Sequence, residues 1–330
     1  MQCDVVLRGL PLNEVGAAAA AAEQAGFAGI GVTESTGNPF LAAAQAAQNT
    51  EHARVTTAIA LAFPRTPMET AYTAWELQGF SGGRFALGLG TQVRAHIERR
   101  YGVPWSRPAA RVREYVLALR TIWDAWQTGG ELRFEGEFTS HTLMPPNFRP
   151  APLDSGPPPV LLAAVRERMC EVAGEVADGV LAHAFCTPDV LHEVTIPALE
   201  RGFARGGRTR ADFELTASVF VALSDEDWEA NRLRVAFYGS TPGYRHVLDH
   251  HGLGALFEQL HAKSKAGEWA SMPGLVDDDV LGLFVVRGDT PEAVASGVRD
   301  RVAGVADRVA LVAAGADPAA IAPVVTAVSR

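Results

Sequence analysis

Short apolar segments alternate along this chain with longer segments whose apolar residues recur at helical spacing. In the first half, the short segments predict buried strands over residues 4–7, 30–33, 55–62 and 85–89. The longer segments between them predict helices over residues 12–24, 39–48, 67–80 and 109–126. Strands separated by helices of this length are typical of βαβ units, so we expect a parallel sheet.

Two stretches interrupt this alternation before it resumes. Glycine and proline residues break regular structure over residues 128–159, and a polar and aromatic helical stretch occupies residues 225–280. Outside them, strands are predicted over residues 160–164, 179–182, 213–223 and 308–312, with a further strand-like segment at 281–286. Eight core strands favour one (β/α)8 TIM-barrel domain over residues 1–330, with both stretches as insertions and the first crossing the barrel mouth. An open doubly wound sheet is the alternative.

The composition narrows the classes of function. The 330 residues are 48% hydrophobic and carry a net charge of −9, so the chain lacks the basic surface that a nucleic-acid partner requires. Its three scattered cysteines predict reduced thiols in a cytoplasmic protein rather than a disulfide scaffold. We expect neither a secretory signal nor a membrane-spanning segment, and no metal site among the histidines at 246, 250 and 251.

Candidate chemistry is expected where the barrel strands end, because working groups lie at the carboxyl ends of strands in this fold. That rule selects Glu34 after the second strand, and Thr91 with Gln92 after the fourth. Glu34 is a lone carboxylate among small and apolar residues. It is either a helix N-cap or an arginine partner, or else a cofactor contact or general acid–base group. Nearby, Gly88 and Gly90 have no Cβ atom, so another group can approach their backbone closely.

The same rule selects Val165 and Arg166 after the fifth strand and His183 after the sixth. Free N–H groups at the start of the helix that follows Val165 favour an anion, although arginines on a first helical turn are also common on surfaces. His183 is either structural or a proton donor near neutral pH.

The second insertion contains an aromatic and polar segment around glycines, FYGSTPGYR at residues 237–245. Such a segment resembles a pocket wall, with a plain helix-to-helix turn as the alternative. We therefore predict substrate contacts from Tyr238, Tyr244 and Arg245, and Arg245 is the expected contact for an anionic group.

Three motifs in the chain resemble those of a known family. SGGRFALGLGTQ at residues 81–92, TAIALAFPRTP at 57–67 and EVADGVLAH at 175–183 are similar to segments of the luciferase-like flavin and deazaflavin oxidoreductases. The similarity is strongest to the branch that uses coenzyme F420. It covers nearly the whole chain and implies a TIM barrel, a homodimer and hydride transfer between F420 and a small organic substrate.

The resemblance also implies roles for individual residues. It places a non-prolyl cis peptide at Ala58–Ile59, against the cofactor ring. Contacts with the ring or ribityl chain would come from Glu34, Ala58, Ile59, Thr91 and Gln92, phosphate contacts from Val165 and Arg166, and catalysis from Glu34 and His183.

Departures from the family pattern limit what is implied. The phosphate loop lacks the glycine usual near Arg166. Ser35 follows Glu34 where some sugar-phosphate-oxidising relatives have histidine, which disfavours a sugar phosphate substrate. An FMN-dependent monooxygenase and a non-catalytic flavin-binding barrel remain the alternatives.

Overall fold

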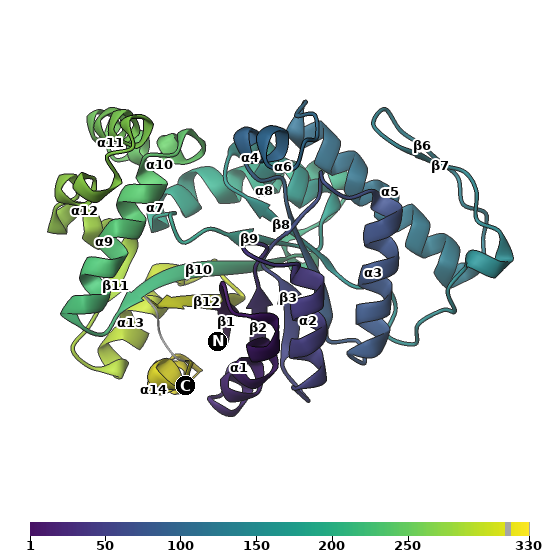
Figure 1. The fold of residues 1–330 in the computed structure, drawn as a ribbon, viewed down its shortest axis with the longest axis horizontal. Coiled ribbons are helices and arrows are strands. Elements are labelled where there is room, and N and C mark those ends of the chain that lie inside the picture. Colours follow the sequence, from purple (N-terminus) through teal and green to yellow (C-terminus); the bar gives the residue numbers. More distant parts are fainter. Residues whose placement is uncertain (314–317, 330) are drawn as a thin grey trace.

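A closed barrel of eight parallel strands forms the centre of the computed structural model, which describes residues 1–313 and 318–329 (Figure 1). The ring runs β1–β2–β3–β5–β8–β9–β10–β12, and β12 pairs with β1 to close it. The strands are β1 Gln2–Leu7, β2 Gly29–Val32, β3 Arg54–Thr57, β5 Phe85–Gly90, β8 Val160–Ala164, β9 Gly179–Ala182, β10 Glu214–Ala222 and β12 Arg308–Ala313. The predicted (β/α)8 barrel is confirmed.

Helices surround this barrel and bury its outer face. They are α1 Leu12–Gln24, α2 Pro39–Gln48, α3 Pro67–Phe80, α5 Pro108–Thr128, α6 Glu167–Val176, α8 Ile196–Gly206, α13 Pro291–Val302 and α14 Pro318–Ser329. Short helices α4 Arg94–Arg99 and α7 Pro188–Val190 occupy connections. Across residues 1–313 and 318–329, no helix combines the length and the apolar character needed to cross a membrane.

The third predicted strand, over residues 55–62, is divided in two by a bulge. β3 pairs Thr56 with Ala86, whereas the next strand, β4 (Ala60–Leu61), pairs Ala60 with Leu89. Between these two pairs, the segment from β3 to β4 has one residue more than β5. The extra residue makes the chain bulge out at Ala58–Ile59.

Gly88 allows the backbone of a neighbouring strand, rather than a ligand, to approach closely. A Cβ atom on Gly88 would overlap the carbonyl oxygen of Thr57. The hydroxyl of Thr57 also donates to the Gly88 carbonyl at 2.8 Å and accepts from the Gly88 N–H at 2.9 Å. The glycine thus fits β3 and β5 together at the point where the bulge begins.

A charged cluster fills the base of the barrel, at the amino ends of four strands. Asp4 of β1 pairs with Arg308 of β12, and both side chains are buried. Arg54 of β3 donates to both carboxylate oxygens of Glu214 on β10, at 2.8 and 2.7 Å, and lies 3.6 Å from Asp4. These pairs neutralise charges that would be costly to bury singly.

The two insertions lie in different places. Residues 129–159 contain the hairpin β6 (Phe134–Glu135) and β7 (Ser140–His141), which extends beyond α5 (Figure 1). The prediction that this segment crosses the mouth is wrong. It is held along the outer surface instead, because Glu114 of α5 accepts from three of its N–H groups and Trp75 of α3 donates to its Ala151 carbonyl at 3.1 Å.

The second insertion builds a helical layer on the barrel. It comprises α9 Asp225–Gly239, the 3-10 turn η4 Pro242–Tyr244, α10 Arg245–His250, α11 Gly254–Ala266 and α12 Asp278–Phe284. The predicted strand over 281–286 is mostly wrong, since α12 extends to Phe284 and the strand β11 covers only Val285–Arg287 beside β10. This layer has its own apolar core, which stacks Phe185 on Phe284.

Candidate active site at the mouth of the barrel

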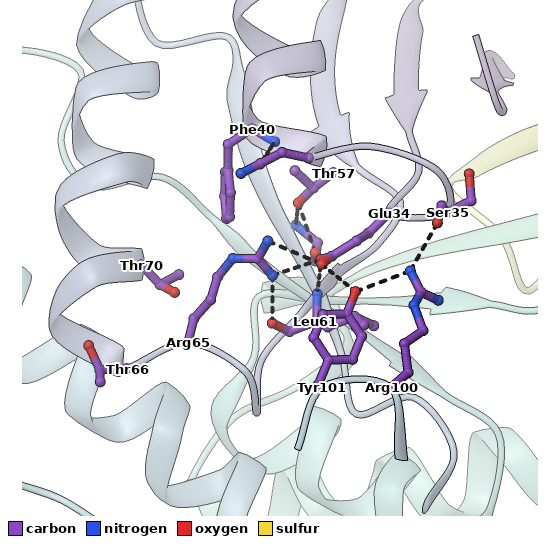
Figure 2. A network of polar contacts seen from close by, with 12 residues as sticks. Glu34, Ser35, Phe40, Thr57, Leu61, Arg65, Thr66, Thr70, Arg100 and Tyr101 are labelled. Carbon is purple, nitrogen blue, oxygen red and sulfur yellow. Dashed lines mark hydrogen bonds and ion pairs between the residues drawn. The ribbon is translucent and has the colours of Figure 1, made fainter. Parts of the chain in front are cut away.

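Glu34, which follows β2, is the centre of a polar network (Figure 2). Its Oε2 accepts from Arg65 Nη1 at 2.7 Å and from the Leu61 N–H at 2.8 Å. Its Oε1 accepts from Tyr101 Oη at 2.9 Å and from Arg65 Nη2 at 3.1 Å. The side chain of Glu34 is 5% exposed and that of Arg65 is 14% exposed, so the ion pair is nearly buried.

These contacts revise the role predicted for Glu34. A carboxylate has about four lone-pair positions, and here four protein donors occupy them. The arrangement therefore supports the arginine-partner interpretation and leaves Glu34 poorly suited to act as a general acid–base group or to accept from a cofactor. Burial and the hydrogen bond to Glu34 raise the pKa of Tyr101, so this tyrosine remains a donor.

Glu34 instead positions the bulge at Ala58–Ile59, where the predicted cis peptide is confirmed. The backbone N–H of Glu34 donates to the Ile59 carbonyl at 3.3 Å, while its side chain accepts from Leu61. On the other side of the bulge, the Ala58 N–H donates to the Val32 carbonyl at 2.7 Å. The bulge is thus hydrogen-bonded at both ends, to Val32 of β2 and to Glu34 just after that strand.

Glycines on both neighbouring strands make room for the side chains of the bulge. A Cβ atom on Gly31 would lie 2.9 Å from the Ala58 Cβ, and one on Gly90 would overlap Ile59. Ala58 and Ile59 themselves remain half-buried, so part of the bulge stays accessible. A small, firmly held surface of this kind fits one face of a flat ring.

Thr91 and Gln92 follow β5 next to this bulge. Gln92 has a left-handed backbone with φ of 59°, and its Oε1 accepts from the Val93 N–H at 2.9 Å. Its side-chain NH2 makes no hydrogen bond to the described residues. Because the oxygen is engaged, this amide offers its two N–H groups as donors.

Val165 and Arg166 lie where predicted, at the start of α6. Arg166 is the N-cap residue of this helix, and its side chain is directed at the second insertion. Its Nη2 donates to the Pro242 carbonyl at 2.5 Å and its Nε to the Gly243 carbonyl at 3.3 Å. The guanidinium thus joins α6 to η4 while keeping its positive charge, because carbonyls are its partners.

His183 follows β9 and packs against the two tyrosines of the second insertion. Its ring centroid lies 4.4 Å from that of Tyr238 and 4.8 Å from that of Tyr244. Nδ1 accepts from the Phe185 N–H at 2.9 Å, which places the proton of the neutral ring on Nε2. Burial, with a smaller contribution from Arg8, lowers the pKa of His183 to about 3.

The surroundings of His183 therefore revise the proton-transfer role predicted for it. A group with so low a pKa is neutral at pH 7 and holds no imidazolium proton to give. Its Nε2–H remains able to donate a hydrogen bond to an oxygen atom.

The structure divides the three predicted substrate contacts. Tyr238 and Tyr244 lie together beside His183, with ring centroids 5.5 Å apart. Arg245 is not brought into this cluster: its guanidinium pairs with Asp249 at 3.1 Å and with Glu258 at 2.8 Å. Two carboxylates already neutralise its charge, so Arg245 is poorly placed to bind the predicted anion.

Sequence reasoning missed three residues of this region. Arg8 directly follows β1, so the strand-end rule would have selected it had it been applied to the first strand. Arg65 could have been found as the arginine nearest to the strand segment that ends beside Glu34. Tyr101 lies in the connection after α4, and nothing in its local sequence marks it.

A cavity of about 500 Å³ lies to one side of these residues, between the β1–α1 and β2–α2 connections. Leu10, Leu12 and Leu41 line it together with Ser35. It does not lie between Glu34 and His183, so we do not assign the reaction to it.

Comparisons with known proteins agree with this architecture. The family model described as luciferase-like monooxygenase matches residues 2–308. An uncharacterized protein of Mycobacterium tuberculosis is 49% identical over 298 residues, which cover 88% of this chain and 87% of that protein. Another protein of that species, provisionally named a coenzyme F420-dependent oxidoreductase, is 31% identical over 74% of this chain and 70% of its own length.

A solved structure shares the fold over nearly the full length of both chains. It is the coenzyme F420 dependent tetrahydromethanopterin reductase from Methanopyrus kandleri, with a TM-score of 0.82, 23% identity, and coverage of 99% of this chain and 98% of that one.

Proposed function

Because the chain belongs to the luciferase-like monooxygenase family, we propose that it is an F420-dependent oxidoreductase acting on a small organic substrate. The relative named for F420-dependent oxidoreduction, which is 31% identical over 74% of this chain, supports the choice of cofactor. The observation that carries the proposal is the bulge at Ala58–Ile59, which is half-buried, bonded at both ends and flanked by Gly31 and Gly90.

The residues present fit a deazaflavin. Ala58 and Ile59 would support one face of the ring, and Thr91 and Gln92 would meet its polar edge or its ribityl chain, with the Gln92 amide as donor. The N–H groups that begin α6 at Val165 and Arg166 would bind the phosphate. When bound, F420 supplies the hydride acceptor or donor, and the protein supplies orientation and electrostatics.

The remaining residues position the bulge and the substrate. The Glu34–Arg65–Tyr101 network holds the bulge rigid, so a ring resting on it would keep one orientation. His183 would donate from Nε2 to an oxygen of the substrate, since its Nδ1 already accepts from Phe185. The proton that accompanies the hydride would then have to come from water or from the substrate itself.

Titration of the full-length protein with F420 and, separately, with FMN tests the proposal. We expect F420 to bind in the micromolar range or tighter, measured by its fluorescence, and FMN to bind at least tenfold more weakly. Reduction or oxidation of bound F420 by a panel of alcohols, aldehydes and imines would then report catalysis. Preferential binding of FMN, with oxygen consumption by its reduced form, would instead identify an FMN-dependent monooxygenase. If a cofactor binds but no substrate reduces or oxidises it, the result would support a non-catalytic barrel.

A further inference from the structure

Two arginines lie beside the cluster formed by His183, Tyr238 and Tyr244, and neither forms an ion pair within residues 1–313 and 318–329. Arg8 is exposed directly after β1, and its Nη1 makes a long contact of 3.5 Å with Tyr238 Oη. Arg234 is half-buried on α9, one helical turn before Tyr238. Its Nη1 donates to the Ala313 carbonyl at 3.1 Å and to Asn231 Oδ1 at 3.3 Å.

The charges of these arginines act on the cluster and on each other. Burial first, and then Arg8, lowers the pKa of both His183 and Arg234. Asp227 acts on Arg234 in the opposite direction and also accepts from the Leu223 N–H at 3.1 Å, so one carboxylate faces two arginines. The region therefore has an excess of positive charge, although the whole chain carries −9.

We propose that Arg8 and Arg234 bind a carboxylate of the substrate beside the ring of His183. The inference rests on the proposed function, because it names the substrate class of the same site. The guanidinium of Arg8 has most of its N–H groups available, and planar guanidinium groups suit carboxylates. The Tyr238 and Tyr244 rings give the rest of the substrate an aromatic wall.

Arg8 and Arg234 replace Arg245, which the sequence predicted as the contact for an anionic group. The Arg245 side chain faces Asp249 and Glu258, whereas Arg8 meets no carboxylate among the described residues. Arg245 follows Tyr244 in the sequence but points away from the tyrosine cluster, so Arg245 serves as the control for Arg8.

Ligand-observed NMR on the full-length protein tests the proposal with defined probes. Benzoate and acetate are each compared with the neutral amide of the same shape, benzamide or acetamide. We expect at least one carboxylate to bind roughly tenfold more tightly than its amide, because a charge-assisted hydrogen bond is lost in the amide. Arg8→Gln should remove most of this preference, whereas Arg245→Gln should keep the affinity within about twofold. Equal binding of carboxylate and amide, or an unchanged affinity in Arg8→Gln, would overturn the proposal.

A competition experiment between benzoate and F420 shows whether the arginines bind a substrate carboxylate or the acidic tail of the cofactor. The wild-type protein is titrated with benzoate in the presence of F420, or of the deazaflavin core that lacks the phosphate and glutamates. We expect benzoate to bind alongside both. Displacement by F420 but not by the shorter core would assign the arginines to the cofactor tail and overturn the proposal. If the protein prefers carboxylates but does not bind F420, the anion site would be supported and the proposed function as an F420-dependent enzyme would be wrong.

Discussion

Glu34 and Arg65 form a two-point ion pair, with Oε2 2.7 Å from Nη1 and Oε1 3.1 Å from Nη2. The two residues lie in different strand-to-helix connections, Glu34 after β2 and Arg65 after β4. The pair therefore holds the connection after β4 against the connection after β2, next to the bulge at Ala58–Ile59.

Breaking this pair should destabilise the protein strongly. In Glu34→Gln, the Arg65 charge remains nearly buried without its partner, and we expect a loss of about 3–5 kcal/mol in the free energy of unfolding. Urea denaturation measures the loss. The exposed pair Arg94–Glu98, with an N–O distance of 2.9 Å, is the control, and Glu98→Gln should cost less than about 0.5 kcal/mol. Similar losses in the two variants would contradict a special role for Glu34.

Gly88→Ala should be one of the costlier single-methyl additions in the barrel. The added Cβ would overlap the Thr57 carbonyl oxygen, so β3 and β5 would have to separate, at a cost of roughly 1–3 kcal/mol or more. Gly282→Ala is the matched control, because Gly282 lies in α12 with open space around it. Alanine there should stabilise the protein by about 0.5–1 kcal/mol. Thermal unfolding of both variants measures these changes. An unchanged midpoint for Gly88→Ala would contradict the tight contact between β3 and β5.

The neutral state of His183 predicts how stability depends on pH. Its pKa is about 3 in the folded protein and about 6.5 in an unfolded chain, so protons bind preferentially to the unfolded state. This contribution to stability is present above pH 6.5 and is lost as the pH falls towards 3, by at most about 1.4 kcal/mol per pH unit. His183→Gln removes it. Between pH 7 and pH 5, the wild type should therefore lose up to roughly 2 kcal/mol more than the variant. Parallel losses would mean that His183 is charged in the folded protein or does not titrate.

Burial also lowers the pKa values of His141, His246 and His251. Their contributions are common to the wild type and to His183→Gln, so the difference between the two proteins isolates His183. Urea denaturation at several pH values provides both curves.

Arg166→Ala should weaken F420 binding, in line with the proposed function. The substitution removes a positive charge from the start of α6 and also releases the Pro242 carbonyl, so we expect a loss of roughly 1.5–3 kcal/mol. Arg168→Ala removes the same charge two residues further along the helix, where the side chain is exposed, and should have a much smaller effect. Fluorescence titration at low salt compares the variants. Equal affinities in all three proteins would place the cofactor phosphate elsewhere.

The barrel could be predicted from the sequence because its signal is repetitive and local. The strand at residues 160–164 and the helix at 67–80 have the predicted limits, since apolar runs and capping residues such as Thr66 mark their ends. The strand predicted over 281–286 was mostly wrong because a run of apolar residues suits a buried helix as well as a strand. The path of residues 129–159 depended on tertiary contacts with Glu114 of α5 and Trp75 of α3, which no local pattern reveals.

The candidate site could be predicted in position but only partly in role. Glu34 and His183 lie just after strands, as the sequence pattern predicted, yet their chemistry depends on partners supplied by other connections. Arg65 and Tyr101 occupy the Glu34 carboxylate, and the tyrosines of the second insertion bury the His183 ring. Such partners come together only in the folded chain, so no local pattern reveals them.

The buried pair of Asp4 and Arg308 also constrains how the protein is made. The carboxylate belongs to the first strand and the guanidinium to the last, so the ribosome completes nearly the whole chain before the two can meet. Until then the Asp4 carboxylate has only Arg54 of β3 as a cationic neighbour, at the longer distance of 3.6 Å, so closing the barrel over it would be less favourable. Because β12 is also the strand that pairs with β1, we expect the barrel to close late, with the edge of β1 accessible until then.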